Sequence, residues 1–189
     1  RAAEHELSLK IITGDAREAD KLTDGQYDHV LLMGPLYHLL EESERVKAVN
    51  AALKLLKQGG IIYISFISSY GGIIYSMKYM PEQIGMPDCE YFFKRFADNL
   101  DFCGDSFTQS YFYRHIDVLP FMAQFPLEKL HYFGQEGITA PCELNFMSQP
   151  KEIVDLWLDL CERVYEREDL LSWSEHLMYI GRKTAEREI

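Results

Sequence analysis

The clearest hydrophobic pattern in the chain lies between residues 27 and 66. Four consecutive apolar residues, 30–33, predict a short strand that is covered on both faces. Apolar residues then recur at spacings of three and four over residues 46–56, which predicts a helix with one buried face that ends at Gly59. Residues 61–66 predict a second strand. Together these elements indicate a βαβ unit with parallel strands and a right-handed crossover.

Shorter patterns predict the remaining elements. We expect a helix end over residues 1–5, a turn over 14–16, strands over 9–13, 127–134 and 175–183, helices over 17–26, 72–78, 88–99, 116–125 and 153–164, and an extended stretch over 108–115. No repeat or Pro/Gly-rich linker divides the chain, so we predict a single domain over residues 1–189. An aromatic-rich segment at about 68–126 either covers a substrate pocket or forms a small aromatic side-core.

Composition narrows the possible partners and compartment. The net charge is −11, from 30 acidic and 19 basic residues without a basic run, which disfavours nucleic acids and anionic membranes as partners. No apolar run reaches the roughly 20 residues that a membrane span needs, and no signal peptide is visible. The four cysteines are scattered, which indicates free thiols in a reducing, cytoplasmic compartment. The histidines lack metal-ligand spacing, so we predict no metal site.

Four motifs carry a family resemblance. They are GDA at 14–16, YDHVLLMGPLYHL at 27–39, LLKQGG at 55–60 and HLMYIGRK at 176–183. In this order the chain resembles the class I S-adenosylmethionine-dependent methyltransferases, in particular a small-molecule branch with a GPLYHL segment after the fourth strand. The resemblance implies an α/β, Rossmann-like fold whose mostly parallel sheet has the strand order 3-2-1-4-5-7-6, with an antiparallel last strand.

The family's glycine-rich loop has no counterpart in this sequence. By the resemblance, that loop and the family's first two strands would precede Arg1, and the two strands would separate strand 9–13 from the rest of the sheet. We therefore expect that the chain is truncated at its N-terminus and corresponds to the C-terminal portion of the domain. A missing segment or a second chain would then complete the sheet, because unpaired backbone groups are costly to bury.

The resemblance implies S-adenosyl-L-methionine as cofactor and assigns a set of residues to it. The set is Gly14, Asp15, Ala16, Met33, Gly34 and Leu36. The carboxylate of Asp15 suits the amino group of adenine, since a carboxylate only accepts hydrogen bonds. Gly34 lets the backbone approach the methionine part of the cofactor closely. The alternative is that Asp15 and Gly34 only turn the chain, as Gly-Asp and Gly-Pro pairs often do.

The methyl acceptor would lie near Tyr37 and His38, our catalytic candidates. His38 suits a general base because its ordinary pKa lies near neutrality, and the alternative is local packing. The expected substrate-binding residues are Tyr70, Tyr113, Arg114 and His115, of which the last two would bind an acidic group. We expect His131 and His176, which lie on predicted strands, to be structural.

The predicted function is a transferase reaction, methyl transfer to a small-molecule acceptor. In such a reaction the cofactor supplies the reactive methyl group, and the protein aligns the acceptor and excludes water. Two alternatives stay open at this point. One is another nucleotide-cofactor α/β enzyme such as a dehydrogenase, which requires a GxGxxG loop upstream. The other is a non-catalytic, methyltransferase-like module whose aromatic segment binds a partner.

Overall fold

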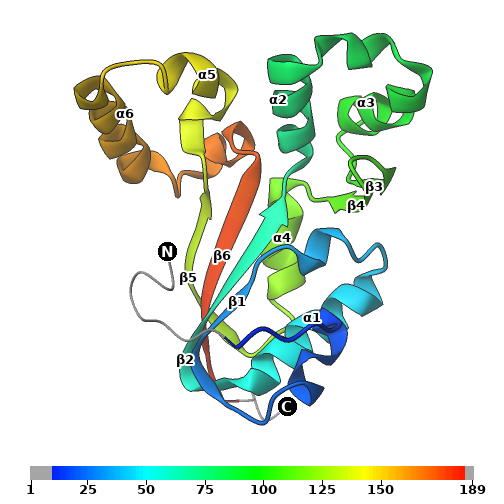
Figure 1. The fold of residues 1–189 in the computed structure, drawn as a ribbon, viewed down its shortest axis with the longest axis vertical. Helices are drawn as coiled ribbons and strands as arrows, with labels where there is room; N and C mark the ends of the chain where they lie inside the picture. Colours follow the sequence, from blue (N-terminus) through cyan, green and yellow to red (C-terminus); the bar gives the residue numbers. More distant parts are fainter. Residues whose placement is uncertain (1–9, 186–189) are drawn as a thin grey trace.

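A four-stranded sheet organises the computed structural model, which describes residues 10–185 (Figure 1). Its order is β1 (Tyr27–Leu32), β2 (Leu56–Ile67), β6 (His176–Lys183) and β5 (Leu127–Gly134). β1 and β2 are parallel, and β6 is antiparallel to both β2 and β5. β1, β2 and β5 therefore run in one direction, and β6, the last strand in the sequence, runs in the other, as predicted. The strand order matches the 4-5-7-6 part of the predicted sheet.

Two helices cover one face of this sheet, α1 (Glu42–Leu55) and α4 (His115–Met122) (Figure 1). The short helix η2 (Ala16–Lys21) joins α1 through the ion pairs Arg17–Glu44 and Lys54–Asp20, at 2.5 and 2.9 Å. The side chains that fill this layer are fully or almost fully buried; they include Leu32, Val49, Ile62, Ile64, Phe66, Val118 and Leu177. Burial of such apolar side chains is the main force that holds the sheet and helices together.

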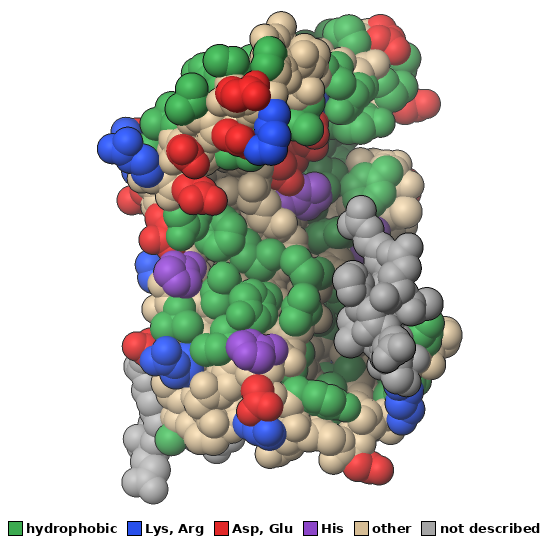
Figure 2. All heavy atoms as spheres, turned by 60° about the vertical axis from the view of Figure 1, so that its left-hand side comes forward, with side chains coloured by type: hydrophobic (Ala, Val, Ile, Leu, Met, Phe, Trp, Pro, Cys, Tyr) green, Lys and Arg blue, Asp and Glu red, His purple; other side chains and the backbone are tan. Residues whose placement is uncertain are grey.

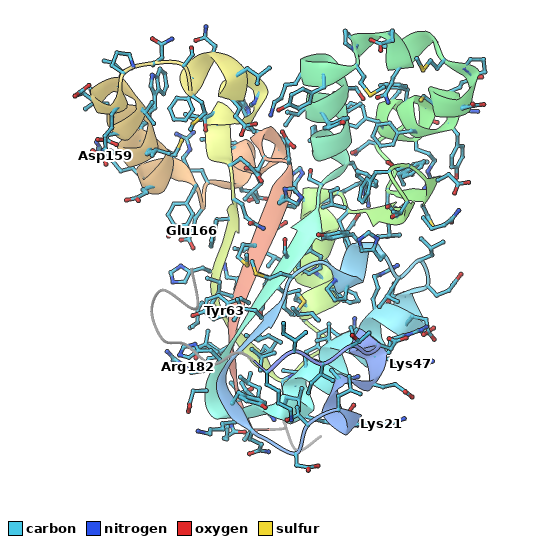
Figure 3. The ribbon with its side chains drawn as sticks, viewed as in Figure 1. Lys21, Lys47, Tyr63, Asp159, Glu166 and Arg182 are labelled. Atoms are coloured by element: carbon cyan, nitrogen blue, oxygen red, sulfur yellow. The ribbon has the colours of Figure 1, made fainter. Side chains whose placement is uncertain are left out.

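The opposite face of the sheet is largely bare within the described residues. Leu31 is 63% exposed and Tyr27 43% exposed, while Tyr63 and Ile180 are half-buried. Figure 2 shows hydrophobic side chains and histidines together on this side of the molecule, and Tyr63 and Arg182 are labelled in Figure 3. The prediction that residues 30–33 are covered on both faces is therefore wrong for this part of the chain, because only the face toward α1 is packed.

The boundary between α1 and β2 also differs from the prediction. The helix ends at Leu55, and Leu56 is already extended and pairs with Tyr27 of β1. Gly59 has a φ of +77°, as expected of a glycine in the left-handed region, but it lies inside β2 and does not cap the helix. The register of the pair shifts between Tyr27, opposite Leu56, and His29, opposite Ile61, and Gly59 lies among the extra residues of β2 at this irregularity.

Two groups of shorter elements extend beyond the end of the sheet (Figure 1). The first comprises η3 (Pro35–Tyr37), α2 (Ser69–Tyr79), η4 (Pro81–Gly85), η5 (Pro87–Cys89), α3 (Glu90–Ala97) and the hairpin of β3 (Phe102–Asp105) and β4 (Gln109–Phe112). The second comprises η6 (Gly137–Cys142), α5 (Glu143–Phe146), α6 (Lys151–Val164) and η7 (Glu168–Trp173). No helix among residues 10–185 is long and apolar enough to cross a membrane.

Other predicted elements are present with shifted bounds, and one is absent. Residues 10–13 form no strand, and Ile11 is 88% exposed; Leu9 and the helix end predicted over residues 1–5 lie outside the described residues. The predicted amphipathic helix over 153–164 is α6, but it contains no buried residue, and Leu156 is 65% exposed. The spacing of its apolar residues thus predicts the helix correctly, but these side chains are not buried in the core.

Candidate functional site

An aromatic cavity of about 990 Å³ lies beyond the end of β2, between α2, α3 and the hairpin of β3 and β4. Seven aromatic side chains of this region line it, namely Tyr75, Tyr91, Phe92, Phe93, Phe102, Phe107 and Phe112. The polar residues that line it include His38, Ser76, Gln83, Asp88, Asp105, Ser106, Glu175 and His176. A large, mostly apolar cavity with a few polar groups is typical of a small-molecule site.

Two adjacent glycines allow the wall formed by α2 to pack closely. Ser68 caps this helix by accepting a hydrogen bond from the backbone N–H of Tyr70. A Cβ at Gly71 would lie 2.6 Å from the carbonyl oxygen of Glu175, and one at Gly72 would clash with the ring of Phe92. The sequence Gly71-Gly72 therefore places α2 against the start of β6 on one side and against α3 on the other.

Arg45 connects the hairpin to the first helix of the sheet layer. It is 3% exposed and donates hydrogen bonds to the carbonyl oxygens of Leu39 and Leu40, at 2.8 and 2.5 Å. Its guanidinium group also lies 3.8 Å from the ring centre of Tyr111 on β4. One buried side chain thus fixes both the segment that follows η3 and one strand of the cavity's outer hairpin.

Tyr37 and His38 are the predicted site residues that the structure brings to the cavity. Both line it, and their rings lie 4.8 Å apart. Nδ1 of His38 lies 3.1 Å from Oγ1 of Thr108, next to the hairpin, and its ring contacts Phe107 edge-on. Both residues thus lie at the cavity, while their position near a methyl acceptor and their catalytic role stay predictions.

The six predicted cofactor residues do not line the cavity. Asp15 caps η2 and forms a paired hydrogen bond with Arg17, which holds the pKa of Asp15 at about 2. Arg17 in turn contacts Glu44 at the start of α1, the helix that also follows Gly34 in the chain. Met33 is 49% exposed, whereas Leu36 is completely buried in the core. The elements that hold Ala16 and Leu36, η2 and η3, both contact α1, and the capping alternative for Asp15 is present in the structure.

The four predicted substrate residues lie outside the cavity wall. Tyr70 packs on Phe96, and Tyr113 is 2% exposed within the core, where burial raises its pKa. Arg114 donates to both carboxylate oxygens of Asp117, so its charge is already neutralised and does not face a ligand. Burial lowers the pKa of His115, whose ring packs against Tyr70. The expectation that Arg114 and His115 bind an acidic substrate group thus finds no support in their placement.

His176 is a cavity residue that sequence reasoning assigned to a structural role. Its Nδ1 lies 2.8 Å from Oε1 of Glu136, and its backbone N–H donates to Oε2 at 2.9 Å. The bond with Glu136 raises the pKa of His176, although burial opposes this. Burial alone would raise the pKa of Glu136, but the bonds from His176 outweigh it and lower that pKa. The two residues are 40 positions apart, so no local motif reveals the pair.

Comparison with known proteins gives a family match over part of the chain. Residues 1–64 match the family model described as "Methyltransferase domain". No curated protein matches the sequence. Among solved structures, an S-adenosylmethionine-dependent methyltransferase from Clostridium acetobutylicum ATCC 824 is 11% identical, with a TM-score of 0.51 over 97% of this chain and 68% of that chain.

A second solved structure differs more in size. It is an O-methyltransferase family protein from Burkholderia thailandensis, 10% identical, with a TM-score of 0.44 over 98% of this chain. The match covers 40% of that protein, so this chain spans less than half of its length.

Proposed function

We propose that this chain, whose residues 1–64 match a methyltransferase domain, acts as a class I S-adenosylmethionine-dependent methyltransferase and takes part in methyl transfer to a small molecule held in the aromatic cavity. The main observation behind the proposal is where the residues that follow β1 lie. Met33 and Gly34, predicted beside the cofactor, are followed within four residues by Tyr37 and His38, which line the cavity. A single loop thereby joins the predicted cofactor rim to the proposed acceptor site.

The backbone at Gly34 suits a closely bound ligand. Its φ is +118°, and a Cβ added there would meet only the side chain of Tyr37, whose hydroxyl is 3.5 Å away. Any other residue would be strained and would extend into this open space. Asp15 keeps a partly exposed carboxylate, 40% accessible, and carboxylate oxygens have lone pairs beyond those that Arg17 uses. These residues fit the methionine and adenine ends of the cofactor.

The protein's contribution would consist mainly of positioning. When bound, S-adenosylmethionine supplies an electrophilic methyl group on a sulfonium, and an acceptor in line with it reacts by displacement. The aromatic wall holds the acceptor and excludes water, and such alignment contributes on the order of 7–11 kcal/mol to lowering a barrier. Tyr37 and His38 lie where they can orient the acceptor group, with His38 also able to accept its proton.

Titration with S-adenosylhomocysteine, followed by calorimetry, tests the cofactor part of the proposal. It is made on the protein with any segment that precedes Arg1, because residues 1–189 lack the family's glycine-rich loop and should bind poorly alone. We expect saturable binding that weakens at least about tenfold in Asp15→Ala, because the adenine amino group loses its acceptor. Asp28→Ala is the matched control, since Asp28 is also an exposed carboxylate paired with a cation, Lys57 at 2.9 Å. This control should bind like the unchanged chain.

Two results would count against the proposal. One is the absence of heat at millimolar S-adenosylhomocysteine, and the other is an equal loss in Asp15→Ala and Asp28→Ala. Binding of NADH in place of S-adenosylhomocysteine would instead support the dehydrogenase alternative. Incubation with labelled S-adenosylmethionine and a panel of hydroxylated and amino aromatic compounds then tests methyl transfer itself.

A further inference from the structure

The imidazole of His176 is fixed in one orientation at the cavity wall. A carboxylate only accepts hydrogen bonds, so the contact between Nδ1 and Oε1 of Glu136 requires a proton on Nδ1. In the neutral ring, Nε2 then carries the lone pair, and it has no hydrogen-bond partner among residues 10–185. Since His176 lines the cavity and Nδ1 is occupied, Nε2 is the nitrogen available to a ligand's O–H or N–H group.

The charged groups around the cavity have one sign. Asp88, Asp105 and Glu175 line it, and no lysine or arginine does so among the described residues. Lys78 on α2 has a side chain that is 5% exposed and lies between Glu143 and Glu175, at 2.5 and 2.8 Å. This ion pair offsets the charges of both Lys78 and Glu175, so Asp88 and Asp105 are the lining carboxylates without a cationic partner among the described residues. An anionic ligand would meet repulsion and no free cation.

The aromatic side chains that line the cavity also favour neutral or cationic ligands, as its acidic residues do. Rings of phenylalanine and tyrosine attract cations at their faces and pack against other rings at their edges. The hydroxyl of Ser76 on α2 already donates to Oε1 of Gln83 on η4 at 2.9 Å, so this side of the cavity has few free polar groups. Besides Tyr37 and His38, the His176–Glu136 pair is thus a second polar anchor in a cavity whose aromatic walls suit a flat apolar ring.

We propose that the cavity takes an aromatic alcohol or amine that is neutral or cationic, and that Nε2 of His176, oriented by Glu136, accepts the hydrogen of its reacting group. This inference rests on the proposed methyl transfer for its chemical step. His176 takes the acceptor's proton on Nε2 as the acceptor's lone pair forms the bond to the methyl carbon. The electron pair of the broken carbon–sulfur bond remains on sulfur, which leaves S-adenosylhomocysteine, and the proton passes from His176 to water.

Binding of three matched probes, without cofactor, tests the ligand class. Tyramine, para-ethylphenol and para-hydroxyphenylpropanoate share a hydroxyphenyl ring and differ in the charge of the tail. We expect the anion to bind at least about tenfold more weakly than the other two by calorimetry or ligand-observed NMR. The double variant Asp88→Asn/Asp105→Asn should reduce this difference, because it removes two of the three carboxylates. Equal or tighter binding of the anion, or no binding of any probe at millimolar concentration, would overturn the proposal.

A second comparison tests the hydrogen bond to His176. The unchanged chain should bind para-ethylphenol more tightly than ethylbenzene, by about three- to tenfold. His176→Phe should remove this preference while ethylbenzene still binds, and His176→Gln should keep part of it, since its side chain retains an acceptor. His131→Phe is the matched control, because His131 pairs with Glu166 at 2.7 Å outside the cavity. Glu166 is labelled in Figure 3.

The outcomes separate this inference from the proposed function. An unchanged preference for the phenol in a folded His176→Phe variant would overturn the role of His176. If His176→Phe does not fold, His176→Gln and the charge series on the unchanged chain still decide. Failure of S-adenosylhomocysteine to bind, with the probe preferences intact, would count against methyl transfer and leave the ligand class in place.

Discussion

The sheet layer and the aromatic cover are built from different side chains and differ in packing. We call the sheet with α1, α4 and η2 the body, and residues 69–112 the cover. In the body, Ile62, Ile64, Phe66 and Leu177 are fully buried. In the cover, α3 contains no buried residue. A small cluster of buried hydrophobic side chains contains two residues of the cover, Phe102 and Phe112. The body therefore provides most of the stability, and the cover provides the cavity in which a ligand is selected.

Removing one large aromatic ring from each region gives the sharpest contrast. Phe66→Ala should destabilise the chain by about 3–5 kcal/mol, because Phe66 is fully buried and packs edge-on against Tyr113 and Phe121. Phe107→Ala should cost less than about 1 kcal/mol, since Phe107 is 60% exposed. Urea unfolding of both variants measures the two free energies. Similar losses would mean that the cover is as tightly packed as the body.

The difference in packing between body and cover also explains which parts of the fold the sequence predicts. The body follows from hydrophobic periodicity, and β5 begins and ends where its apolar and β-prone residues predict. The cover has aromatic residues without a period, so the sequence does not predict which rings face one another. Tyr70 and Tyr113 illustrate this, because they belong to the same aromatic run yet pack away from the cavity. The cover expected at about 68–126 stays a prediction, and His115–Met122 of that range form α4, which packs on the sheet.

The candidate site was predictable only where its residues are close in sequence. Tyr37 and His38 follow a strand and a Gly-Pro turn, which places them at a sheet edge. The pairing of His176 with Glu136 depends on the relative position of two strand ends, and tertiary contacts alone determine that position. Arg114, which we expected to bind an acidic group, is paired with Asp117 one helical turn away, a contact that the sequence pattern did not reveal.

Arg45 tests whether the cover depends on the body. Arg45→Met keeps a long side chain but removes the donors to Leu39 and Leu40 and the stacking on Tyr111. We expect a loss of about 1–3 kcal/mol, since two carbonyl groups lose a charged donor. Hydrogen exchange should become faster in β4 than in β6, because β4 packs against the guanidinium group. Equal acceleration in both strands would show that Arg45 stabilises the whole chain and does not specifically join the two regions.

The His176–Glu136 pair predicts a pH dependence of stability with a defined sign. The raised pKa of His176 contributes stability below its ordinary value of 6.5, and this is lost as the pH rises through the folded-state pKa. The lowered pKa of Glu136 contributes stability above 4.5, and this is lost as the pH falls through its folded-state pKa. Glu136→Gln should therefore cost most between pH 4.5 and 6.5. The loss should be about 1 kcal/mol or less, because both side chains are about one-third exposed to solvent.

The exposed pair His131–Glu166 provides the control for this experiment. Its side chains are 48% and 46% exposed, so Glu166→Gln should change the free energy of unfolding by no more than a few tenths of a kcal/mol. Urea unfolding at several pH values measures both variants against the unchanged chain. A flat difference across pH for Glu136→Gln would mean that the pair is not ionised in the way its geometry implies.

The smallest expected effect concerns the contact between His38 and Thr108, where the loop after β1 meets the cover. Thr108→Val removes the hydroxyl that lies 3.1 Å from Nδ1 of His38 while keeping the branched shape. Because both residues are accessible to water, the free energy of unfolding should change by less than about 0.5 kcal/mol. The His38 ring should nevertheless become more mobile by NMR relaxation. If the acceptor's proton passes to His176, binding of para-ethylphenol should remain within about twofold; a larger loss would indicate that His38 is the hydrogen-bond partner.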